Sequence, residues 1–117
     1  AYANYNDVWS DGWVGPRLQA LRKAAGGERR LCLRGNANLG YFTDLLVLSI
    51  QLNGQEIIRQ TVRASGDFLL EILLPQPLIS GEHTISVQAN VWFVPHRFMH
   101  NRDYRPLTWR MVELFFA

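Results

Sequence analysis

Alternating apolar and polar positions run through most of this chain, and they predict strands. The clearest case is residues 46–52, where apolar side chains recur at every second position before Asn53-Gly54. That pair is preferred in two-residue type I′ turns, so we expect a β-hairpin with a return strand over residues 56–64. Similar alternation predicts further strands over residues 13–21, 31–34, 68–74, 85–93 and 107–116.

Glycine and proline separate these segments, and the intervening stretches are short. About seven or eight strands with no convincing helix predict an all-β fold, a two-sheet antiparallel β-sandwich of jelly-roll or immunoglobulin-like type. Residues 17–25 also tolerate helical geometry, but Gly15-Pro16 directly before them favours a strand. Residues 1–12 are too polar for a core strand and too aromatic for a linker, so we expect an ordered N-terminal arm.

Composition places the whole chain, residues 1–117, in one folded domain. The chain is 48% hydrophobic and 19% charged, which is typical of a globular protein with a single core. Its longest apolar runs are far too short to span a bilayer, so we expect no direct membrane insertion. Cys32 is the single cysteine, which excludes an internal disulfide and fits a reducing compartment.

The sequence lacks the motifs of the common enzyme classes. The acidic residues are scattered at strand ends and turns, and no nucleophile elbow, phosphate-binding glycine loop or zinc motif occurs. His96 and His100 have a helical spacing but follow Pro95 in an expected loop, which argues against a metal site. We therefore expect no catalytic residue, no cofactor and no metal, although Asp7, Asp11 and Asp103 leave a calcium site as a minor alternative.

The arginines also argue against nucleic-acid binding. Eleven of the twelve basic residues are arginine, but they are spread over nearly every strand and are balanced by ten acidic residues. A nucleic-acid site would need a basic stripe interleaved with aromatic side chains. We therefore expect no nucleic-acid partner.

Aromatic and polar residues gather in two places, the arm and the loop after Pro95. Flat aromatic rings stack on the apolar faces of sugars, and Asp, Asn and Arg side chains bind pairs of hydroxyl groups. The two stretches together predict a glycan-binding groove. Its candidate residues are Asp7, Trp9, Asp11, Trp13, Arg97, Asn101, Asp103, Tyr104 and Arg105.

Structural roles compete with this interpretation. Trp92 and Trp109 lie inside expected strands, so we expect both to pack in the core. For Trp9 and Trp13, anchoring the arm over an open sheet edge competes evenly with binding a ligand. Asp103 and Arg105 are expected to pair with each other across a turn.

Two stretches are similar to a known family. Residues 11–16 read Asp-Gly-Trp-Val-Gly-Pro, and residues 93–95 and 101–109 read Phe-Val-Pro and Asn-Arg-Asp-Tyr-Arg-Pro-Leu-Thr-Trp. They resemble a β-sandwich accessory domain attached to bacterial glycosyltransferases of cell-surface polysaccharide synthesis, and the likeness covers residues 8–114. The resemblance implies a cytoplasmic domain of a longer protein that binds a glycan or packs against the linked catalytic domain. It carries over no catalytic residue.

The leading hypothesis is thus a noncatalytic carbohydrate-associated module that tethers a bacterial surface polysaccharide near a linked glycosyltransferase domain. Tethering raises the local concentration of an acceptor, so even millimolar affinity suffices. The rival is a structural domain that packs on a catalytic partner or self-associates without binding a ligand. Several strands favour it because they carry apolar residues on both faces: Leu45, Val47, Ile57, Leu69 and Leu73.

Overall fold

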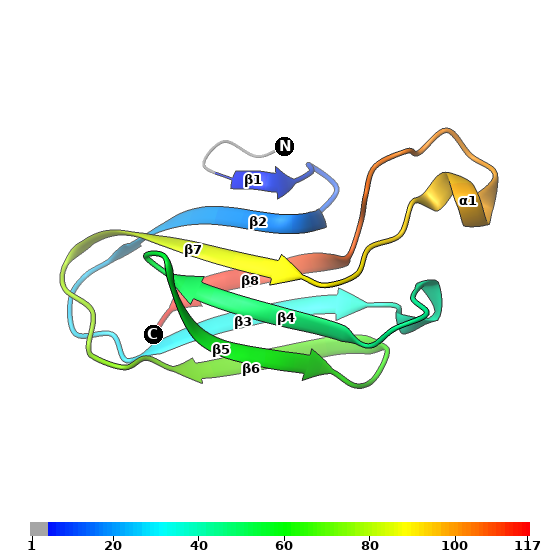
Figure 1. The fold of residues 1–117 in the computed structure, drawn as a ribbon. Coiled ribbons are helices and arrows are strands. Elements are labelled where there is room, and N and C mark those ends of the chain that lie inside the picture. The colour runs from blue at the N-terminus through cyan, green and yellow to red at the C-terminus, as the bar shows by residue number, and fades with distance from the viewer. Residues whose placement is uncertain (1–4) are drawn as a thin grey trace.

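In the computed structural model of this chain, the structure describes residues 5–117, without the side chains of residues 5–7. Strands make up most of these residues, as Figure 1 shows. The strands are β1 (Tyr5–Val8), β2 (Trp13–Ala24), β3 (Arg30–Ala37), β4 (Leu46–Leu52), β5 (Gln55–Val62), β6 (Gly66–Leu73), β7 (Gly81–Ala89) and β8 (Trp109–Phe116). Two short helices, η1 (Leu39–Tyr41) and α1 (Pro95–Met99), complete the fold, so the prediction of a nearly all-β domain is confirmed.

The strands pair antiparallel in one nearly closed sheet. Its order is β5-β4-β7-β2-β8-β3-β6. β2 joins two wings of this sheet, because Trp13 and Val14 pair with β8 whereas residues 17–24 pair with β7. Val14 also pairs with Val8, so β1 covers the other edge of β2. Residues 15 and 16 lie between the ladders to β8 and β7 and pair in neither, and a division into two separate sheets stays a prediction.

The hairpin predicted around Asn53-Gly54 is confirmed. β4 and β5 pair from Leu46↔Val62 to Leu52↔Gln55. Asn53 and Gly54 have φ of 50° and 87°, the positive values that a type I′ turn requires at both central positions. The Asn53 side chain also accepts a hydrogen bond from the Thr84 amide, which fixes the turn against β7.

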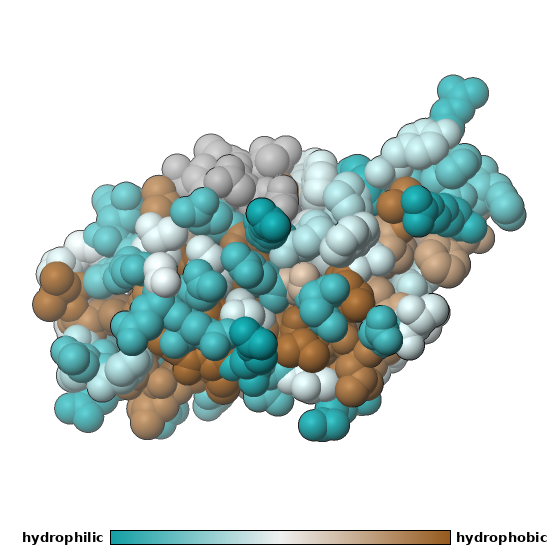
Figure 2. All heavy atoms as spheres, in the orientation of Figure 1, coloured by the Kyte–Doolittle hydropathy of each residue, from teal (hydrophilic) through white to brown (hydrophobic). Residues whose placement is uncertain are grey.

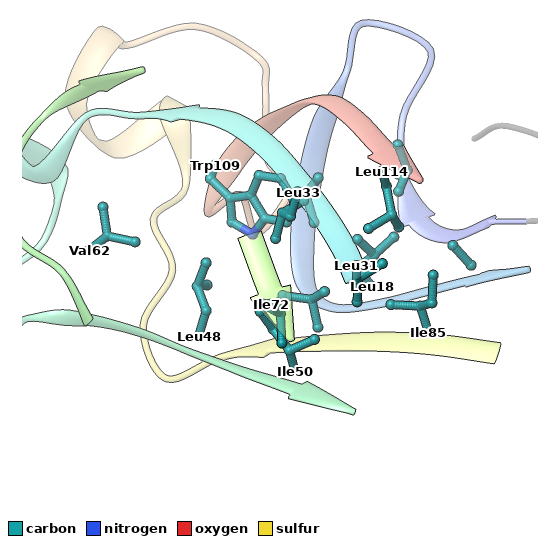
Figure 3. Close-up of a cluster of buried hydrophobic side chains, with 14 of the residues drawn as sticks. Leu18, Leu31, Leu33, Leu48, Ile50, Val62, Ile72, Ile85, Trp109 and Leu114 are labelled. Atoms are coloured by element: carbon teal, nitrogen blue, oxygen red, sulfur yellow. The ribbon is translucent and has the colours of Figure 1, made fainter. Parts of the chain in front are cut away.

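One core lies between the wing formed by β5, β4 and β7 and the wing formed by β8, β3 and β6. Figure 3 shows side chains from both wings pointing toward one another, including Leu48, Ile50 and Ile85 from one wing and Leu31, Leu33 and Trp109 from the other. Full burial of such an aliphatic side chain stabilises the fold by about 1.5–3 kcal/mol. Because the inward positions are apolar, this alternation fixes which face of each strand turns toward the core.

The outer faces of the two wings differ in chemistry. The β5-β4-β7 wing turns Ser49, Gln51, Ser86 and Gln88 outward, and Figure 2 shows much of this side covered by hydrophilic residues. The β8-β3-β6 wing instead exposes four large apolar side chains: Leu69, Leu73, Val112 and Phe115. Leu69 and Leu73 are 53% and 75% exposed.

The expected strand over residues 85–93 ends earlier, at Ala89. The Asn90 side chain donates to the Leu45 carbonyl and accepts from the Val47 amide, so it takes the place of backbone partners at the end of β7. The chain then bends, and Phe93 forms an isolated bridge with Leu107. Trp92 is 56% exposed, in phase with the outward Ser86 and Gln88, so the prediction that it packs in the core was wrong, whereas Trp109 is fully buried as predicted.

The loop expected after Pro95 contains the helix α1, which sequence analysis missed. Pro95 occupies the first helical position, where its missing N–H costs nothing, and His100 ends the helix in the left-handed conformation. α1 and the segment after it project from one end of the sheet (Figure 1). Within residues 5–117, no helix has the length and apolar character needed to cross a membrane.

Candidate functional site

The two sequence stretches that flank the predicted groove meet in space through Arg105. Its guanidinium donates to both oxygens of Asp103, at 2.9 and 2.7 Å, and to both oxygens of Asp11, at 3.3 and 3.0 Å. Two such forked contacts on one guanidinium hold the turn before β2 against the segment before β8. The predicted Asp103–Arg105 pair is confirmed, and Asp11 joins it.

Trp9 completes this group, which we name the Arg105 cluster (Trp9, Asp11, Asp103 and Arg105). The guanidinium carbon lies 5.2 Å from the centroid of the Trp9 ring, within the range of a cation–π contact. Trp9 itself is held by the turn, since its amide donates to the Trp13 carbonyl and its carbonyl accepts from Gly12. The cluster therefore closes one end of the fold.

The carboxylates of the cluster have little capacity left for a ligand. Asp11 accepts from the Trp13 amide as well as from Arg105, and Asp103 accepts from the Arg105 amide. The hydrogen bonds from Arg105 lower the pKa of both aspartates, and the two carboxylates in turn raise the pKa of Arg105. Because these charged groups already bind one another, the cluster stabilises the fold and offers little to a ligand.

Asn101 and Tyr104 line an open hollow of about 740 Å³ together with Asp103 and Arg105, but Trp9, Trp13 and Arg97 are not among its lining residues. Asn101 accepts from the Asp103 amide, and Tyr104 is 65% exposed with its ring 4.5 Å from that of His96. Arg97 is exposed on α1. Asp7 lies in β1, and its side chain is outside the described ones.

Trp13 leads from the Arg105 cluster to a second site. Its ring meets the edge of Phe93 at 5.6 Å, and the guanidinium carbon of Arg110 lies 5.9 Å from its centroid. Arg110 also donates to the Asp11 carbonyl at 3.0 Å. Trp13 therefore supports an arginine that sequence analysis did not single out.

Arg110 belongs to a row of polar side chains across three neighbouring strands. Asn36 of β3 pairs with Asp67 of β6 on one side and with Arg110 of β8 on the other. The Asn36 amide donates to Asp67 Oδ1 at 3.0 Å. We name Asp67, Asn36 and Arg110 the polar row.

A cleft of about 460 Å³ lies over the polar row, between the outer face of the β8-β3-β6 wing and the turn before β2. Met111 and Val112 add an apolar wall, and the backbone at Gly12 closes the other side. The lining residues are Ser10, Asp11, Gly12, Asn36, Asp67, Arg110, Met111 and Val112.

The polar row keeps hydrogen-bonding capacity that the Arg105 cluster has used. Asp67 has a second carboxylate oxygen, and Arg110 has two further guanidinium nitrogens, with no partner among the described residues. Acceptors and donors that lie side by side next to apolar side chains suit a ligand with paired hydroxyl groups. The cleft is thus the better candidate for a binding site.

Asn36, Asp67 and Arg110 could not be found from the sequence because they come from three separate strands. Each is a polar residue at an outward strand position, which is the ordinary case for a sheet with one wet face. Only the order β8-β3-β6 brings them together. Of the residues predicted from the sequence, Asp11 lines this cleft, and the polar row was not predicted.

No group of three or more His, Cys, Asp or Glu side chains comes together as a metal site within the described part of the chain. Asp11 and Asp103, two members of the calcium alternative, both bind Arg105. His96 and His100 are joined by the backbone, where the His100 amide donates to the His96 carbonyl, and the His96 ring donates to the Asn101 carbonyl.

Comparisons with known proteins add no assignment. The chain matches no model of a protein family, and a search of curated proteins finds no similar sequence.

Proposed function

We propose that this domain is a noncatalytic carbohydrate-associated module that binds a glycan in the cleft over the polar row. The observation that carries the proposal is the row itself, in which an open carboxylate oxygen and open guanidinium nitrogens lie beside the apolar wall of Met111 and Val112. A sugar can offer pairs of hydroxyl groups to the carboxylate and the guanidinium, and the C–H face of its ring to the apolar wall.

In this proposal the sugar makes hydrogen bonds to the polar row and apolar contacts to Val112. Asp67 accepts a hydrogen bond from one hydroxyl group, Arg110 donates to a neighbouring hydroxyl oxygen, and Asn36 lies between them and donates to Asp67. Val112 is exposed and offers its methyl groups to the ring. The domain supplies no chemistry in this proposal, and the bound chain is held close to a linked active site.

The charges around the cleft favour neutral glycans over acidic ones. The cleft is lined by two carboxylates, those of Asp11 and Asp67, and by one guanidinium, that of Arg110. A uronate would bring a second carboxylate close to Asp67, and like charges at short range weaken binding. A neutral sugar is not repelled by Asp67 in this way.

We further propose the setting that the sequence resemblance implies: a longer bacterial protein in the cytoplasm, with a glycosyltransferase domain beside this one and its two wings acting as the two sheets of a sandwich. Tethering through a weak site is effective there because the linked domain makes the encounter intramolecular. Affinity of order millimolar is enough for that role.

Calorimetric titration of the chain with neutral hexasaccharides of glucan, galactan and mannan type, and with an acidic oligouronate, tests the proposal. We expect saturable binding of at least one neutral probe and weaker binding of the oligouronate. Asp67→Asn and Asn36→Ala should each weaken binding about 3–10-fold, since each removes a hydrogen bond of about 1 kcal/mol. Asn101→Ala is the matched control, because Asn101 lies in the predicted groove but outside the cleft. Absence of saturable binding, or binding that is indifferent to Asp67→Asn, would contradict the proposal.

The rival function is an interaction domain, and one observation favours it. The same wing that carries the cleft exposes Leu69, Leu73, Val112 and Phe115 to solvent. Large exposed apolar side chains on a sheet face are typical of contact surfaces, and here the ion pairs Arg30–Glu71 and Arg34–Glu113 lie between them. This face serves an interaction whether or not a glycan occupies the cleft.

A further inference from the structure

The two strands that end the sheet differ in how well they are protected. β5 and β6 each have one edge without a strand partner among the described residues. β5 is blunted by a register irregularity opposite Ile50 and Gln51, and it carries the ion pair Glu56–Arg59 at 3.1 Å. Irregular pairing and charged side chains are the usual means of protecting an edge.

β6 lacks the irregular pairing of β5, although it also carries charged side chains, those of Asp67 and Glu71. It pairs with β3 over eight consecutive residues, from Arg30↔Leu73 to Ala37↔Gly66, without an irregularity. Leu69 and Leu73 are exposed on its outer face. A regularly paired edge strand with exposed leucines is a template for another strand.

We propose that β6 is the edge through which this chain pairs with a second copy of itself. Two identical strands related by a twofold axis pair antiparallel, with each residue opposite its symmetry mate. With the axis at Glu71, Leu69 lies opposite Leu73 of the second copy and Leu70 lies opposite Ile72 of the second copy. Apolar cross-strand pairs then form on both faces of the extended sheet.

The charges at the axis complement one another in this register. The two Glu71 side chains face each other, which alone would be unfavourable. Arg30 lies next to Glu71 on β3, with Nη1 3.9 Å from Oε2. The dimer therefore brings two arginines to two glutamates, and each guanidinium can serve both carboxylates.

The arrangement has a consequence for binding that rests on the proposed function. A twofold axis perpendicular to the sheet leaves the outer faces of both copies, and so both clefts, on the same side. Asp67 is four residues from Glu71, or about 13 Å at about 3.3 Å per residue, so the two polar rows lie about 26 Å apart along the strand direction. One extended glycan can reach both rows, and this would raise the apparent affinity without a new contact.

Sedimentation equilibrium of the chain tests the pairing without any glycan. We expect the mass to rise from 13.5 kDa toward twice that value, with a dissociation constant of about 100 µM because paired edge strands bury less than a standard interface. Leu69→Asp should weaken the dimer at least tenfold. Leu45→Asp is the matched control, since Leu45 is similarly exposed but lies outside β6. A chain that stays monomeric at about 1 mM, or a dimer that Leu69→Asp leaves intact, would overturn the proposal.

Charge reversal at Glu71 tests the register. Glu71→Arg places four arginines at the axis, so this variant alone should dissociate at least tenfold more readily than the natural chain. An equal mixture of the variant with the natural chain should recover a mixed dimer, because the introduced arginine then faces the glutamate of the natural copy. Thermal melting of the separate variant checks that it is folded, as expected for an exposed position. A variant that dimerises like the natural chain, or a mixture without mixed dimer, would overturn the register.

Discussion

The Arg105 cluster and the polar row are neighbouring groups of the same residue types, yet they serve different ends. In the cluster, one guanidinium is forked by two carboxylates and covered by Trp9, and the side chains of Arg105 and Asp103 are only 28% and 24% exposed. In the row, Asn36 and Asp67 bind each other, and the charged groups retain open positions toward the cleft. The difference teaches that charged side chains near a cleft indicate a binding site only where their hydrogen-bonding groups are not already paired within the protein.

Substitution of Gly35 is expected to have the largest effect, because this residue packs tightly between β6 and β8 beside the polar row. A Cβ atom there would lie 2.7 Å from Phe68 and Trp109 and 2.8 Å from the Arg110 carbonyl. We expect Gly35→Ala to lower the free energy of unfolding by about 3 kcal/mol through overpacking. It should also weaken glycan binding, since β8 must shift away from β3 at the polar row. Chemical denaturation checks the first effect, and a loss below about 0.5 kcal/mol would contradict the tight packing.

Removal of Arg105 separates the structural group from the binding group. Arg105→Ala leaves two carboxylates facing each other and should lower the free energy of unfolding by about 2 kcal/mol, allowing for partial exposure. Arg105→Lys should recover only part of this, since an ammonium cannot make two forked contacts. Arg102→Ala, at an exposed neighbour, is the control and should cost less than about 0.5 kcal/mol. Equal losses for Arg102→Ala and Arg105→Ala would count against a structural role for the cluster.

Acidification should reveal the same cluster. Arg105 lowers the folded-state pKa of Asp11 and Asp103 from the ordinary value of 3.8. A lowered folded pKa contributes stability that is present above 3.8 and is lost as the pH falls through the folded values. We therefore expect melting temperatures to fall more steeply below about pH 4 for the natural chain than for Arg105→Ala. Glu28, whose pKa is also lowered by backbone amides, contributes equally to both chains and cancels.

Parallel pH curves for the natural chain and Arg105→Ala would show that the aspartates gain nothing from the arginine. Buffers of constant ionic strength are needed for this comparison, because salt screens exposed charges.

The polar row should show the smallest effect on stability. Asp67→Asn keeps the oxygen that Asn36 binds and removes only a charge exposed to solvent, so we expect a change in unfolding free energy within about 0.5 kcal/mol. Thermal melting checks this in the same samples used for sugar titration. A large loss of stability would place Asp67 with the structural group.

The sequence was sufficient for features that depend on local order. Asn53-Gly54 between alternating strands predicted the hairpin, and the short spacing of Asp103 and Arg105 predicted their pairing. Asp11 meets Arg105 across 94 positions, and that contact depends on β2 and β8 being neighbours. No local pattern reports strand order.

The errors have local physical causes as well. Trp92 falls in the outward phase of β7 with Ser86 and Gln88, so the alternation itself places it outside the core, and only the general preference of tryptophan for cores suggested burial. The helix α1 was not predicted because Pro95 ends a strand pattern. Proline also suits the first position of a helix, which is the position that Pro95 occupies here. The polar row was missed because each of its members looks like an ordinary outward residue.

Mapping backbone amide chemical shifts during titration with a neutral hexasaccharide tests the central claim most directly. We predict saturable shifts at Asn36, Asp67 and Arg110 and at the turn formed by residues 10–12, with unchanged shifts over residues 97–104. Shifts confined to residues 97–104, or no shifts at high millimolar sugar, would contradict the claim that the open polar row is the binding site of this domain.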